Sequence, residues 1–157
     1  MRRMISWLLV AALLMAPVAA LASLDSGLID DAKQALTLMS YGEYKKALKK
    51  LNLKKASSAQ ALSDFVDSSL SDIYAVAVQT DVAVAYKTDG VWRVAVPVEA
   101  PSYDTVQTLV VRAKDGKRFD AYKAMAWYEV MDQVDAAEEV IWQDAYEQGE
   151  LYLLPDA

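Results

Sequence analysis

The sequence predicts one α+β domain, in which N-terminal helices pack on a four-stranded antiparallel meander and a C-terminal helix closes the fold. Three observations predict this architecture. Apolar residues recur at helical spacing as far as residue 73, the spacing then changes to alternation, and two Asp-Gly pairs interrupt the alternating part. Asp-Gly between alternating runs is typical of a hairpin turn. The 157-residue chain leaves 135 residues beyond position 22, which is enough for one domain with a buried core.

Residues 1–22 have the pattern of an export signal. Arg2 and Arg3 precede an apolar run, and Ala20 and Ala22 place small side chains where a signal peptidase accepts them, which predicts cleavage before Ser23. Cleavage after Ala20 fits nearly as well. The alternative is an uncleaved anchor, because a run of about 17 apolar residues approaches the roughly 20 that span a bilayer. We expect a periplasmic or secreted protein with no membrane span once the signal is removed.

Two predicted helical regions follow the signal. Residues 24–55 predict a helical hairpin, with apolar positions at helical spacing and Gly42 ending the first helix. The stretch Tyr41-Gly42-Glu43-Tyr44-Lys45-Lys46-Ala47-Leu48 resembles the inter-helix turn of a tetratricopeptide repeat, although no 34-residue repeat follows it. The resemblance implies a packing arrangement suited to protein interaction. Residues 58–73 predict another helix, in which Ser57 and Gln60 form a capping box.

Residues 75–130 predict the antiparallel sheet, with hairpin turns at Asp89-Gly90 and Asp115-Gly116. Within it, residues 120–131 fit either state, because their alternation favours a strand while their Ala, Met and Glu content suits a helix. A last helix is predicted over residues 133–148. Asp132 or Asp135 would cap it, and its inward-facing residues would be Val134, Ala137, Ile141 and Ala145.

Basic and acidic residues are unevenly distributed along the chain. Without Arg2 and Arg3, 14 basic residues face 22 acidic ones, a net charge of −8 that argues against nucleic-acid binding. Nine acidic residues and no basic residue follow Lys123. Six lysines crowd one short stretch: Lys45, Lys46, Lys49, Lys50, Lys54 and Lys55. They predict either a polybasic face for an anionic partner or a solvated helix face, and charge runs more often have the second role.

The sequence lacks the residues that most catalytic mechanisms use. The chain has no histidine and no cysteine, which excludes histidine-based triads, thiol nucleophiles and the usual zinc sites, and no glycine-rich phosphate-binding motif is present. Carboxylates remain, with Glu99, Asp104 and Glu129 as candidates for glycan cleavage. Asp132, Asp135 and Glu138 could hold calcium, but an acidic first helical turn explains them better. We therefore expect no cofactor.

The tryptophans offer a second kind of candidate surface. Trp92, Trp127 and Trp142 could stack on a sugar, but Trp92 alternates in phase with neighbouring valines, which favours core packing. The candidate interaction surface therefore consists of the six lysines together with Trp92 and Trp127.

These patterns favour a non-catalytic binding or protein-interaction module in the bacterial envelope. The expected partner is another exported protein or an envelope glycan. The alternative is a carboxylate-dependent enzyme that cleaves envelope glycans.

Overall fold

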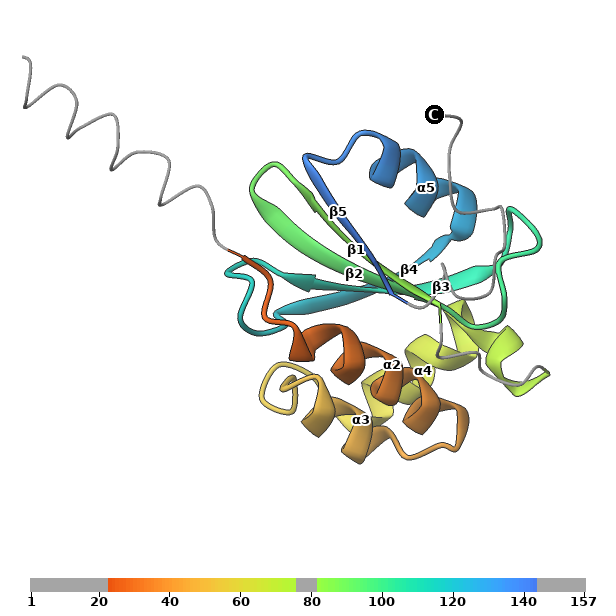
Figure 1. Ribbon diagram of the computed structural model, residues 1–157. Helices are drawn as coiled ribbons and strands as arrows, with labels where there is room; N and C mark the ends of the chain where they lie inside the picture. The colour runs from red at the N-terminus through yellow and green to blue at the C-terminus, as the bar shows by residue number, and fades with distance from the viewer. Residues whose placement is uncertain (1–22, 76–81, 144–157) are drawn as a thin grey trace, which may run out of the picture.

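The computed structural model describes residues 23–75 and 82–143, which form an α+β fold of three layers (Figure 1). One helical layer lies on one face of an antiparallel sheet, and α5 lies on the other face. The helices are α2 (Gly27–Ser40), α3 (Tyr44–Lys50), α4 (Ala59–Ser69), the short 3-10 helix η1 (Ser71–Tyr74) and α5 (Trp127–Asp135). The strands are β1 (Ala83–Thr88), β2 (Val91–Pro97), β3 (Gln107–Ala113), β4 (Ala121–Ala126) and β5 (Glu139–Gln143). The predicted export signal, residues 1–22, lies outside the described residues.

Within the described residues the sheet has five strands in the order β4-β3-β2-β1-β5, with every neighbouring pair antiparallel. The first four strands form the predicted meander. Alternation along the strands gives the sheet two different faces. Trp92, Val94 and Val111 belong to the face that the N-terminal helices cover. Tyr86 and Arg93, paired across β1 and β2, belong to the opposite face.

Both faces of the central strands contribute to the core, which explains why β1 and β2 are so apolar. On the helical side, the Phe65 ring of α4 meets the Tyr122 ring of β4 edge to face, with centroids 4.8 Å apart. Next to them, the Ser57 and Tyr122 hydroxyls share a hydrogen bond of 2.9 Å. On the other side, the buried Tyr86 hydroxyl donates to Gln133 Oε1 of α5 at 2.6 Å.

Two helix ends fix the path of the hairpin that α2 and α3 form. After α2, Gly42 has φ of 73°, and the Glu43 N–H donates to the Leu38 carbonyl at 2.9 Å. After α3, Asn52 has φ of 56°, and the Leu53 N–H donates to the Leu48 carbonyl at 2.8 Å. Both ends are Schellman motifs, in which a left-handed residue lets the chain turn back and satisfy the last carbonyls of the helix.

The C-terminal part of the fold corrects two predictions. Residues 120–131 are neither all strand nor all helix, because β4 ends at Ala126 and α5 begins at Trp127. The helix predicted over 133–148 is correct only as far as Asp135, where α5 ends. It is wrong beyond that residue, because Glu139–Gln143 forms β5 on the free edge of β1. Val140, Ile141 and Trp142 are β-branched or aromatic, and they favour a strand once an edge is there to pair with. Positions 144–148 lie outside the described residues.

The cap of α4 also differs from the prediction. Ser58, not Ser57, is the N-cap residue, and its Oγ accepts from the Ala61 N–H at 3.1 Å. Gln60 donates to Asp64 at 2.9 Å instead of reaching back to the cap. Ser57 is thus left to bond Tyr122 and joins the helical layer to the edge strand β4.

Candidate functional site

The six lysines of the predicted cluster lie on α3 and on the turn that follows it, and we call this surface the lysine face. Lys45, Lys46, Lys49, Lys54 and Lys55 are exposed, and Lys50 is half-buried. Beneath them Ala47, Leu48, Leu51 and Leu53 are buried in the core. The Schellman motif at Asn52 holds the segment that carries Lys54 and Lys55 against the end of α3. The charges therefore stand on a fixed backbone.

Two of these lysines are neutralised locally. Lys46 pairs with Glu43 at 3.0 Å, and Lys50 pairs with Asp31 of α2 at 3.4 Å. Within residues 23–75 and 82–143, no ion pair involves Lys45, Lys49, Lys54 or Lys55. Lys49 also lies in the last turn of α3, where a positive charge is favoured by the helix dipole. The lysine face thus carries a positive excess in a chain whose net charge is −6.

Trp92 lies in the core and not on the lysine face. It is 1% exposed, and the Lys87 ammonium lies 5.9 Å from the centroid of its ring. A Cβ added at Gly116 would lie 3.3 Å from Trp92 Cδ1, which shows how closely the β3–β4 connection covers the ring. The core packing that its alternation favoured is confirmed, and as it lies Trp92 cannot stack on a sugar.

Trp127 is buried as well, at 3% exposure, in the first turn of α5. Its backbone N–H donates to the Val106 carbonyl at 2.9 Å, so it anchors α5 to the segment that precedes β3. Trp142 of β5 is partly buried and packs against the core. The structure therefore does not join the two predicted tryptophans to the lysines in one exposed surface.

The carboxylates considered for catalysis are only partly brought together. The Asp104 carbonyl accepts from the Tyr128 N–H at 2.8 Å, which places Asp104 next to the first turn of α5. Glu129 lies in that turn, but its Oε2 accepts from the Ala126 N–H at 2.9 Å. This carboxylate caps the helix. Glu99 lies after β2, in the connection to β3.

The acidic residues Asp132, Asp135 and Glu138 do not open a helix as predicted. Asp132 and Asp135 lie toward the C-terminal end of α5, and Glu138 follows it. Among the described residues, no group of three potential ligands is placed to hold a metal ion. Negative charge near the C-terminal end of a helix interacts unfavourably with the helix dipole. Asp132 and Asp135 therefore do not stabilise α5 in the way an acidic first turn would.

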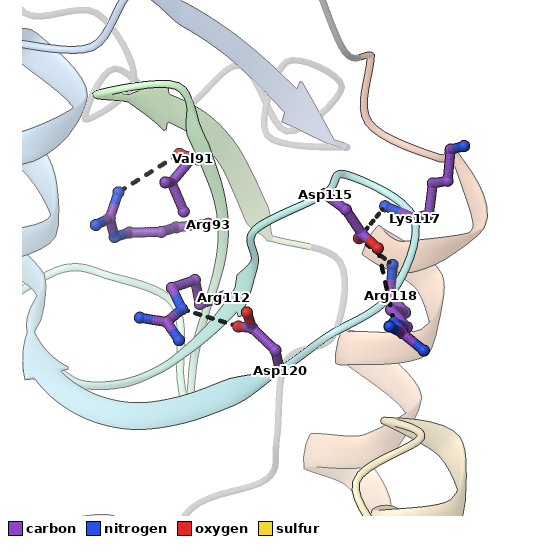
Figure 2. Close-up of polar contacts among 7 residues, drawn as sticks. All are labelled: Val91, Arg93, Arg112, Asp115, Lys117, Arg118 and Asp120. Carbon is purple, nitrogen blue, oxygen red and sulfur yellow. Dashed lines mark hydrogen bonds and ion pairs between the residues drawn. The ribbon is translucent and has the colours of Figure 1, made fainter.

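A second cationic group was not predicted from the sequence. Arg93 of β2 and Arg112 of β3 are register partners, and Figure 2 shows their side chains extending on the same side of the sheet. Lys123 of β4 pairs with Val110, two residues from Arg112, and so shares this face. With Val110, Ala121 and Tyr122, these three cations line a pocket of about 130 Å³. We call it the arginine pocket.

Hydrogen bonds fix both guanidinium groups. Arg112 Nε donates to Asp120 Oδ1 at 2.8 Å, and this bond, with the negative charge of Asp120, raises the pKa of Arg112. Arg93 Nη1 donates to Thr88 Oγ1 at 3.0 Å. It also donates to the Val91 carbonyl at 3.4 Å, the bond drawn in Figure 2. Each guanidinium therefore keeps N–H groups for which no partner is recorded in the part of the chain that the structure describes.

The connection between β3 and β4 holds a third polar cluster, beside the arginine pocket. Asp115 accepts from the backbone N–H groups of Lys117 and Arg118 at 2.9 and 3.0 Å (Figure 2), and these bonds lower the pKa of Asp115. Arg118 Nε also lies 3.6 Å from Asp115 Oδ2. This cluster shapes the turn, and its cation already has a carboxylate partner.

No protein-family model, curated protein or solved structure matches this chain. Function is therefore inferred from the two cationic surfaces and from the residues that the sequence lacks.

Within the described ranges 23–75 and 82–143, no helix is long and apolar enough to cross a bilayer. The lysine face is visible in the sequence because its charges are close together along the chain. The arginine pocket is not, because Arg93, Arg112 and Lys123 lie on three different strands that only the strand register brings together.

Proposed function

We propose that this protein is an exported, non-catalytic binding module whose lysine face engages an acidic surface of another exported protein in the bacterial envelope. The observation that carries the proposal is the set of four exposed lysines outside the ion pairs of the described residues, carried by α3 and the turn after it in a net acidic chain. Charge complementarity with an acidic partner speeds association and selects that partner against basic ones.

A protein partner suits this surface better than a glycan. No exposed aromatic ring lies among the lysines themselves, because Tyr44 is half-buried and Trp92 and Trp127 are buried elsewhere. The exposed rings are at the border of the face: Tyr41 lies in the turn before α3, and the Tyr74 hydroxyl shares a 2.7 Å hydrogen bond with that of Tyr44. Sugar recognition commonly uses stacking on an aromatic ring, whereas several ammonium groups spaced along a fixed backbone suit carboxylates spread over a protein surface. An acidic glycan in the envelope is the competing partner.

The export part of the proposal rests on residues 1–22. Two arginines, an apolar run and small residues at the end of that run are the features of a secretory signal. Mass spectrometry of the protein recovered from the producing cells tests it: the exported form should begin at Ser23 or Leu21. A form in the membrane fraction that retains Met1 would instead indicate an anchored protein.

The non-catalytic part rests on the absence of histidine and cysteine and on the role of Glu129 as a helix cap. The competing activity is carboxylate-dependent cleavage of an envelope glycan. Turnover of peptidoglycan or another envelope glycan that disappears on Glu99→Gln, Asp104→Asn or Glu129→Gln, with folding retained, would overturn the binding proposal.

The decisive experiment compares two quadruple variants of the full chain. In the first, Lys45, Lys49, Lys54 and Lys55 become glutamine, and in the matched control the same four become arginine. Each protein is used to isolate partners from native envelope material at 0.05 M and 0.5 M salt. We expect one acidic protein that the wild type and the arginine control retain at low salt, and that the glutamine variant and high salt release. Equal retention by the glutamine variant would contradict the proposal, and retention of glycan alone would assign the face to the competing partner.

A further inference from the structure

The arginine pocket has features that stability alone does not explain. Arg93 and Arg112 lie directly opposite each other on β2 and β3. Like charges directly opposite each other on neighbouring strands destabilise a sheet. Lys123, on the same face of β4, adds a third positive charge. An arrangement that costs stability and surrounds a hollow is typical of a binding site.

The hydrogen bonds of the pocket hold the two guanidinium groups in place. Asp120 accepts from Nε of Arg112, which leaves both terminal nitrogens of that side chain for a ligand. Thr88 Oγ1 and the Val91 carbonyl both accept from Nη1 of Arg93, and Nη2 of Arg93 makes no hydrogen bond within the described residues. Two guanidinium groups fixed in this way present planar N–H donors that match the oxygens of a phosphate or a carboxylate.

Charge and size distinguish between these two anions. Arg93, Arg112 and Lys123 carry three positive charges, Asp120 neutralises one, and none of the six residues that line the pocket is acidic. The remaining charge of about +2 matches a phosphate monoester, which carries about −1.5 to −2 at pH 7, better than a carboxylate, which carries −1. The pocket volume of about 130 Å³ leaves room for a small anion such as a single phosphate group.

We propose that Arg93, Arg112 and Lys123 form a binding site for a phosphate group, supplied by inorganic phosphate or by a small phosphate monoester. The two arginines lie on the sheet face that α5 partly covers, whereas α3 belongs to the opposite layer (Figure 1). Its occupation would convert the repulsion between Arg93 and Arg112 into shared attraction for one ligand.

Isothermal titration calorimetry of the full exported chain tests the site. Inorganic phosphate, glycerol 3-phosphate and acetate are compared in chloride buffer at matched ionic strength, together with vesicles that contain phosphatidylglycerol. We expect saturable binding of phosphate, of glycerol 3-phosphate or of both, with acetate at least about tenfold weaker because it carries half the charge. Acetate that binds as tightly as phosphate would overturn the assignment, and so would binding to vesicles alone.

Substitutions locate the binding. Arg93→Gln and Arg112→Gln should each weaken phosphate binding at least about tenfold, because each removes a charge-assisted hydrogen bond. Arg118→Gln is the matched control, since Arg118 is an exposed arginine of the same region that pairs with Asp115 outside the pocket, and it should leave the affinity unchanged. Lys123→Gln serves as a further variant if either arginine variant fails to fold. Affinity that is unchanged in the pocket variants, or lost equally in Arg118→Gln, would contradict the proposal.

Discussion

Arg93 and Arg112 are direct register partners on β2 and β3, and their guanidinium groups extend on the same side of the sheet (Figure 2). In a net acidic chain this places two like charges side by side where an oppositely charged or neutral pair would stabilise the sheet better. The nearby carboxylate of Asp120 compensates only Arg112.

A double-mutant cycle should detect this repulsion. With Arg93→Gln, Arg112→Gln and the double variant, urea unfolding in chloride at low ionic strength should give an unfavourable coupling of about 0.2–1 kcal/mol between the two arginines. The coupling should shrink in 0.5 M sodium chloride, because salt screens exposed charges. A favourable coupling at low salt would show that the two side chains do not repel each other.

Gly116 should tolerate substitution less well than Gly90. Both have positive φ, 71° and 74°, so alanine at either position costs about 1–2 kcal/mol in backbone strain. At Gly116 an added Cβ would also lie 2.7 Å from the Ser23 carbonyl oxygen, whereas at Gly90 it meets no atom within 4 Å. We expect Gly116→Ala to lower the free energy of unfolding by at least about 1 kcal/mol more than Gly90→Ala. Equal losses in urea unfolding would show that the N-terminal segment does not lie against this turn.

The contact between the sheet and α5 should depend on pH through Tyr86. Burial raises the pKa of its hydroxyl from the ordinary value of about 10 to about 12. Because the folded state favours the neutral form, this contribution to stability is complete below pH 10 and is lost as the pH rises from 10 to 12.

Comparison with Tyr86→Phe isolates this effect. From pH 9 to pH 12 the wild type should lose up to about 2–3 kcal/mol more stability than Tyr86→Phe, as measured by urea unfolding. At pH 9 the variant should be less stable by about 1 kcal/mol, because it lacks the hydrogen bond to Gln133. Parallel losses in the two proteins would contradict the burial of a titrating hydroxyl at this position.

The sequence predicted most of the fold where a periodic pattern met a clear turn signal. The α2–α3 hairpin and the turn at Asp89-Gly90 are examples, and positive φ at both Asp89 and Gly90 is what such a hairpin requires. The C-terminal part was mispredicted because Val134 to Ile141 fits a helical stripe. Residues 139–143 instead form β5 because they pair with the free edge of β1, a tertiary contact that a local sequence pattern does not show.

The same distinction applies to the candidate surfaces. Consecutive lysines remained together when the chain folded, because a helix and its cap carry them. Trp127 could not be placed from sequence because it lies at the junction between β4 and α5, within the residues whose state was ambiguous. The arginine pocket required the register of three strands, which only long-range pairing determines.

The central claim, that the lysine face is the partner-binding surface, is tested most directly by lysine reactivity. The exported chain is treated with an amine-acylating reagent, alone and with envelope material, and modification at each lysine is quantified by mass spectrometry. We predict that Lys45, Lys49, Lys54 and Lys55 lose reactivity in the presence of the partner, while the exposed Lys114 keeps it. Unchanged reactivity at those four lysines, or protection at Lys114 alone, would contradict the claim.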